Sequence, residues 1–175
     1  MEQGYKTLAF VVIVVLYAVI GLMAAAGTIS IARKMLAPKA EQIFYAMFLI
    51  MIAAFYLAFA AYFGAATALR LETAVVAVFV ALALPGARLP LVLIVGYSLH
   101  GLWDLLHELQ ARGAYSAFDP GQLTPIPLAY GFFCAAFDFF MAAYFYVRRA
   151  VWIAAWKGSC GERNGLGPPP RHSRA

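Results

Sequence analysis

The sequence predicts an all-α integral membrane protein, a bundle of about five transmembrane helices. Hydrophobic residues make up 65% of its 175 residues and charged residues only 12%, whereas about a quarter of a soluble domain is charged. The mean hydropathy of +0.81 is correspondingly high. The net charge of +5 does not indicate nucleic-acid binding, because the basic residues lie in the loops and the tail, where membrane topology favours them. We therefore expect the lipid bilayer, and no nucleic acid, as a partner.

Five apolar runs are candidate spans, since about 20 helical residues cross about 30 Å of hydrocarbon. In chain order they cover about residues 8–32, 41–63, 71–84, 89–109 and 125–147. A pair of basic residues follows the first run, beginning at Arg33, and another follows the fifth, beginning at Arg148. The third run is short and ends at Pro85, so a full crossing, a tilted course and a partly re-entrant course all stay open for it.

The spans belong to one transmembrane domain, residues 1–156, followed by a tail, residues 157–175. The stretch "AVWIAAW" after the fifth span is amphipathic or interfacial. The tail is polar and rich in Gly and Pro, a composition typical of disorder. At the start of the second span, Glu41 is expected to be an exposed acid at a helix N-terminus.

The basic residues predict the orientation of the chain. Ten of the thirteen lysines and arginines follow the first, third and fifth spans; these are Arg33, Lys34, Lys39, Arg88, Arg148, Arg149, Lys157, Arg163, Arg171 and Arg174. Because basic loops stay in the cytoplasm, the N-terminus is expected outside and the C-terminus inside. The membrane is expected to be a bacterial inner membrane.

The fourth span carries an unusual group of ionisable residues in the stretch "HGLWDLLHEL". Side chains at i, i+4 and i+7 share one face of a helix, and His100, Asp104 and His107 have this spacing. Glu108 lies at the edge of the same face. Two imidazoles and a carboxylate therefore project from one stripe of an otherwise apolar helix.

Two acids on neighbouring spans extend this group. Asp138 lies near the middle of the fifth span and Glu72 opens the third. A charged side chain at mid-bilayer costs roughly 2.5 to 3.5 kcal/mol, so such groups face the interior of a bundle and find partners. We expect both acids to converge with His100, Asp104 and His107 on one polar cavity in the outer half of the bundle.

Three hypotheses explain such a cavity. A buried hydrogen-bond network would only hold the helices together, whereas intramembrane Asp and His also build proton or ion pathways. The third hypothesis is a divalent metal site, zinc or iron, with Glu72, His100, Asp104, His107 and Asp138 as ligands. On this hypothesis the protein carries out metal-dependent chemistry on a lipid or other apolar substrate. The sequence leaves open whether the protein is an enzyme, a carrier of a proton, ion or small molecule, or a structural protein.

The same residues resemble a known family. The small membrane proteins of domain-of-unknown-function family 6010 carry the pattern H-x-x-W-D-x-x-H-H-L, then a loop with proline, then C-A-x-x-D. The matching positions are His100, Trp103, Asp104, His107, Leu109, Cys134, Ala135 and Asp138, and Glu72 corresponds to an acid that opens the preceding helix. Glu108 departs from the pattern, which has a second histidine there. The resemblance covers roughly residues 70–145 and implies no activity.

Overall fold

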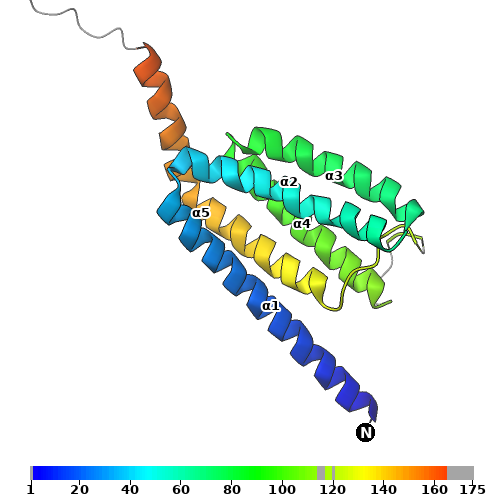
Figure 1. Ribbon diagram of the computed structural model, residues 1–175. Coiled ribbons are helices and arrows are strands. Elements are labelled where there is room, and N and C mark those ends of the chain that lie inside the picture. Colours follow the sequence, from blue (N-terminus) through cyan, green and yellow to red (C-terminus); the bar gives the residue numbers. More distant parts are fainter. Residues whose placement is uncertain (1, 114–116, 120, 165–175) are drawn as a thin grey trace, which may run out of the picture.

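The computed structural model describes residues 2–113, 117–119 and 121–164, and this part of the chain forms five helices and no strand. The helices are α1 (Glu2–Met35), α2 (Pro38–Tyr62), α3 (Ala66–Gly86), α4 (Pro90–Ala111) and α5 (Tyr130–Asn164). Figure 1 shows α2, α3, α4 and α5 side by side in one bundle, with α1 running along α5. The predicted all-α class is confirmed.

The helices are those of an integral membrane protein. Among the described residues, four stretches are long and apolar enough to cross a membrane: Thr7–Met35, Pro38–Tyr62, Ala66–Gly86 and Tyr130–Gly158. The remaining helix, α4, has a similar length of 22 residues, but its ionisable side chains lower its hydropathy. It lies against α3 and α5, so these side chains are covered by protein.

Two helices differ in length from the predicted spans. Helix α3 begins at Ala66, because the turn after α2 takes only the few residues around Gly64, whose φ is +64°. Helix α5 begins at Tyr130 rather than at Pro125, since Pro127 disfavours a helical conformation at the residue before it. At its other end α5 continues to Asn164. The first residues of the expected tail are therefore helical, and 165–175 lie outside the described residues.

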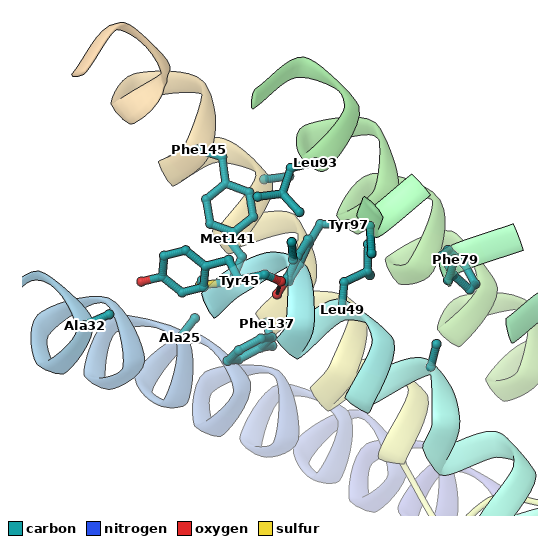
Figure 2. Close-up of a cluster of buried hydrophobic side chains, with 14 of the residues drawn as sticks. Ala25, Ala32, Tyr45, Leu49, Phe79, Leu93, Tyr97, Phe137, Met141 and Phe145 are labelled. Carbon is teal, nitrogen blue, oxygen red and sulfur yellow. Dashed lines mark hydrogen bonds between the residues drawn. The ribbon is translucent and has the colours of Figure 1, made fainter. Parts of the chain in front are cut away.

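Aromatic and aliphatic side chains from α2, α4 and α5 form the core at the end of the bundle where α1 meets α2. Tyr45, Tyr97 and Phe145 are fully buried there, and Figure 2 shows them packed together with Met141. The hydroxyl of Tyr97 donates to the carbonyl oxygen of Tyr45 over 3.0 Å. The core between these three helices is thus largely apolar; the hydroxyl of Tyr97 is satisfied by backbone, and that of Tyr45 is buried without a hydrogen-bond partner among the described residues.

Helix α1 lies close to α5 because of a glycine. A Cβ atom at Gly21 would lie 2.3 Å from the carbonyl oxygen of Phe133, a distance that no side chain tolerates. Nearer the N-terminus, the ring of Phe10 contacts the ring of Phe132, with centroids 6.5 Å apart. Small residues allow such close approach between helices in lipid, and here the approach fixes where α1 crosses α5.

Glu41 is buried, and the prediction that it would be exposed is wrong. Its carboxylate accepts hydrogen bonds from the hydroxyl of Tyr144, from Nε of Arg148 at 3.2 Å and from Nε1 of Trp152 at 3.1 Å. The next residue, Gln42, accepts a hydrogen bond from Nε1 of Trp156 at 3.0 Å. Because α5 extends past the predicted span, its last turns cover the start of α2 and satisfy both polar side chains.

Candidate metal centre

Three ionisable residues from α4 and α5 meet inside the bundle. Nδ1 of His100 lies 2.7 Å from Oδ2 of Asp138 and 3.2 Å from Oδ2 of Asp104. Each of the three is at most 1% exposed, and their nearest possible ligand atoms all lie within 4.8 Å of one another. We call these three residues the His–Asp–Asp cluster.

The helices bring the cluster to one level. At a rise of 1.5 Å per residue, His100 lies about 16 Å below the end of α4, and Asp138 about 12 Å below the start of α5. The backbones also come close here, since a Cβ at Gly101 would lie 3.3 Å from Cβ of Asp138 and 3.2 Å from the ring of Phe139. The i, i+4 spacing on α4 adds Asp104 to the same face.

Tyr56 of α2 completes the wall of the cluster. Its hydroxyl donates a hydrogen bond to Oδ1 of Asp104, and its ring packs against both histidines, with centroids 6.0 Å from His100 and 4.2 Å from His107. Sequence reasoning missed this residue. Nothing in the second span separates it from the other nine tyrosines of the chain, and only the fold places it beside an acid.

The cluster contains buried polar atoms that are not hydrogen-bonded. Nε2 of His100, Oδ2 of Asp104 and Oδ1 of Asp138 are buried and find no hydrogen-bond partner among the described residues. Buried polar groups are normally paired, and buried charges are paired or coordinate a metal. One imidazole also faces two carboxylates here. If both are ionised, even a protonated imidazole leaves one negative charge uncompensated, whereas a divalent cation with a neutral imidazole balances the charge.

The distances suit metal ligands. Zinc binds nitrogen and oxygen ligands at about 2.0 to 2.2 Å, which places two ligand atoms of a tetrahedral ion about 3.3 Å apart. The contact of 3.2 Å between His100 and Asp104 is close to this value, and that of 2.7 Å to Asp138 needs a small opening. His100, Asp104 and Asp138 could therefore hold one ion with little rearrangement.

His107 and Glu72 form a separate pair. Nε2 of His107 lies 2.8 Å from Oε1 of Glu72, and its Nδ1 donates to the carbonyl oxygen of Trp103 over 3.0 Å. The backbone N–H of Thr124 donates to the same carboxylate oxygen over 3.1 Å. Glu72 from α3 contacts α4 at His107, whereas Asp138 from α5 contacts it at His100, about two helical turns away. The five predicted ligands thus make two groups rather than one.

Glu108 holds the start of α5. Its carboxylate accepts hydrogen bonds from the backbone N–H groups of Ala129 at 3.2 Å and Gly131 at 3.1 Å, and from Nε of Arg112 at 3.0 Å. A carboxylate is favourable at a helix N-terminus because it satisfies free N–H groups and the helix dipole. Glu108 therefore has a structural contact and lies outside the His–Asp–Asp cluster.

A pocket of about 440 Å³ borders the cluster. Its lining comes from α1, α2 and α5, with His100 from α4. The lining residues are Ala24, Thr28, Phe48, Met51, Ile52, Phe55, Phe59, His100, Tyr130, Phe133, Cys134, Phe137 and Asp138. Met51 and Phe55 at its rim are 49% and 46% exposed, so the pocket opens toward the lipid. We call it the slot.

Fold and cluster together define an all-helical integral membrane protein with ionisable groups buried beside a lipid-facing pocket. The chain belongs to the family of unknown function DUF6010, whose model matches residues 13–151. The match extends the resemblance seen in the sequence to the first two helices. No curated protein and no solved structure matches the chain.

Proposed function

We propose that the protein binds a divalent metal ion through His100, Asp104 and Asp138. The observation that carries the proposal is the set of three buried ligand atoms from two helices within 4.8 Å of one another. The unpaired buried atoms of the cluster support the same conclusion. His107 and Glu72, which satisfy each other and the backbone, lie outside this ligand set.

The ligand types favour zinc, iron or manganese. Imidazole suits zinc and iron, carboxylates suit harder cations, and the cluster contains no thiolate ligand. Three protein ligands with further positions left for water or substrate are typical of catalytic rather than structural zinc sites. Such an ion would polarise a substrate oxygen or activate a bound water.

The slot supports an enzyme that acts on a lipid or other apolar substrate. Pockets for small ligands are mostly apolar, with a few polar groups that fix the orientation of the ligand, and the slot has this character. In an enzyme, Tyr56 would hold Asp104 in position through its hydroxyl.

The alternative function, a carrier of protons or ions, has less support. A carrier needs a polar path that continues to the other side of the membrane. Between the cluster and the Glu41 end of the bundle lie the packed side chains of Leu49, Leu93, Tyr97 and Met141, all buried. Among the described residues, the buried ionisable groups nearest the cluster continue in the opposite direction, through the His107–Glu72 pair.

For the orientation we propose an outer N-terminus and a cytoplasmic C-terminus in a bacterial inner membrane. The end of α1, the start of α2, the end of α3 and the start of α4 share one end of the bundle, as Figure 1 shows. The basic residues Arg33, Lys39 and Arg88 lie at this end. The positive-inside rule then places the loop between α4 and α5 outside.

Metal content tests the proposed centre. The full chain is purified in detergent without chelators, offered zinc, iron or manganese, and analysed for bound metal after removal of excess. Wild-type protein is expected to retain about one equivalent, and His100→Ala and Asp138→Asn to retain almost none. His107→Gln is the matched control, since it alters a second buried histidine on the same helix, and it is expected to keep the metal. Equal metal in His100→Ala and wild type would refute the assignment.

A further inference from the structure

The depth of the His–Asp–Asp cluster restricts what it can reach. His100 is in the middle of α4, about 16 Å from the end of the helix. The hydrocarbon layer is about 30 Å thick, so its midplane lies about 15 Å below the ester linkages of a lipid. The cluster is therefore near the bilayer midplane, far from the layer that holds head groups.

The slot runs along the helices. Its α2 side extends from Phe48 to Phe59, about 16 Å of helix, and its α5 side from Tyr130 to Asp138, about 12 Å. Lipid chains in a bilayer lie in this same direction. The end of the slot at Phe59 and Tyr130 is close to the loop between α4 and α5, and the rings of these two residues contact each other with centroids 5.1 Å apart.

The lining selects an uncharged occupant. Ionisable groups border the slot only at His100, Cys134, Asp138 and the hydroxyl of Tyr130, whereas the remaining lining is almost entirely apolar. The exposed rim at Met51 and Phe55 lets an occupant move in sideways from the bilayer. A hydrocarbon chain fits this lining, because a head group in the slot would lose its hydration without gaining partners.

We infer that the substrate is a membrane lipid whose long acyl chain lies in the slot, with its head group at the loop end. The carbons that meet the His–Asp–Asp cluster are then those of the chain interior, and the ester linkage stays about 15 Å away, at the surface of the hydrocarbon layer. The inference rests on the proposed metal centre for any reaction, but occupation of the slot by the chain does not require the metal.

Photo-crosslinking measures which part of a lipid reaches the cluster. The full chain is reconstituted into phosphatidylcholine vesicles that contain a probe lipid with a diazirine either halfway along one acyl chain or next to the ester carbonyl. After irradiation and digestion, the labelled residues are identified by mass spectrometry. The halfway probe is expected to label the segment from Cys134 to Asp138, several-fold more than the ester-proximal probe does. The ester-proximal probe is expected to label the region of Tyr130.

A pair of variants separates binding in the slot from contact with surrounding lipid. Met51→Trp narrows the rim, whereas Met47→Trp places the same ring one turn away on α2, at a residue that is 65% exposed and does not line the slot. The first is expected to lower labelling of the Cys134–Asp138 segment by the halfway probe several-fold, and the second to leave it unchanged. Unchanged labelling in Met51→Trp overturns the inference. Equal labelling of the cluster by both probes also overturns it, because that result would indicate chemistry at the head group. A crosslink between two copies of the chain through the slot is a third result that overturns it.

Metal analysis of the same samples distinguishes the two proposals. If wild-type protein holds no metal but shows the expected labelling, the metal centre is refuted while the position of the chain is supported. If metal is bound and the labelling pattern is absent, the metal centre stands and the acyl-chain substrate is refuted.

Discussion

His100 and Asp138 are 38 positions apart in the chain, yet Nδ1 of the histidine lies 2.7 Å from Oδ2 of the aspartate. The contact depends on close packing of α4 against α5. One glycine of α5 makes this packing possible, since a Cβ at Gly131 would lie 2.4 Å from the carbonyl oxygen of Asp104 and 2.7 Å from Cβ of Glu108. The proposed metal centre is therefore tied to the distance between two helix backbones.

Gly131→Ala is expected to push α5 away from α4 and to weaken metal binding together with stability. Overpacking of this kind costs about 1 to 3 kcal/mol. Thermal unfolding in detergent and metal content would both be measured. Gly158→Ala, on the same helix with no atom within 4 Å of the added Cβ, is the control. It should leave the metal content unchanged and should not lower the melting temperature. Full metal content and an unchanged melting temperature in Gly131→Ala would show that neither metal binding nor stability depends on the close contact of α4 with α5.

The crossing of α1 and α5 gives a second prediction. Gly21→Ala places a Cβ 2.3 Å from the carbonyl oxygen of Phe133, so the helices must separate and the melting temperature in detergent should fall. Gly27→Ala on the same helix has open space around it and should raise helix stability by up to about 1 kcal/mol. The account of this crossing fails if both substitutions stabilise the protein equally.

The buried carboxylate of Glu41 gives a third prediction. Glu41→Ala leaves the side chains of Arg148 and Trp152 without their acceptor, and loss of one partner from a buried ion pair costs about 3 to 5 kcal/mol. Because Arg148 keeps part of its side chain exposed, 21%, the loss should fall at the low end of this range. Tyr144→Phe removes one donor only and should cost about 1 kcal/mol. Unfolding midpoints in denaturant would rank the two variants, and a larger effect for Tyr144→Phe would contradict this role of Glu41.

Most of the ionisable residues at the site could be predicted from the sequence, because ionisable side chains are rare in membrane spans and costly when they face lipid. In an apolar chain His100, Asp104 and Asp138 can only face protein, and helical spacing places the first two on one face of α4. Sequence reasoning also placed Glu72 with these residues, and the structure has it in contact with His107. The sequence prediction grouped all five residues in one cavity, whereas the structure has two groups. Periodicity along α4 could not separate them, because it does not indicate which neighbouring helix contacts each turn of α4.

Other features depend on the fold and could not be read from the sequence. Tyr56 acts through a contact with α4 that no spacing in the second span indicates. Glu41 was expected to be exposed because it begins the second span next to a basic loop, whereas the extension of α5 carries Trp152 over it. The basic pair at Arg148 reads as the end of a span, yet one of these arginines bonds to Glu41 and the helix continues.

The orientation of the chain can be tested with reporters fused to the C-terminus. With ten of thirteen basic residues on one side, a reporter that is active only in the cytoplasm should be active there, and one that is active only in the periplasm should be inactive. The reverse result would invert the proposed topology and move the slot to the inner leaflet.

Anomalous X-ray scattering tests the metal centre most directly. Crystals of the zinc-loaded protein, measured on both sides of the zinc absorption edge, would show where the ion lies. The account predicts a peak about 2 Å from an imidazole nitrogen of His100 and from carboxylate oxygens of Asp104 and Asp138. A zinc peak between His107 and Glu72, with none at the His–Asp–Asp cluster, would contradict it.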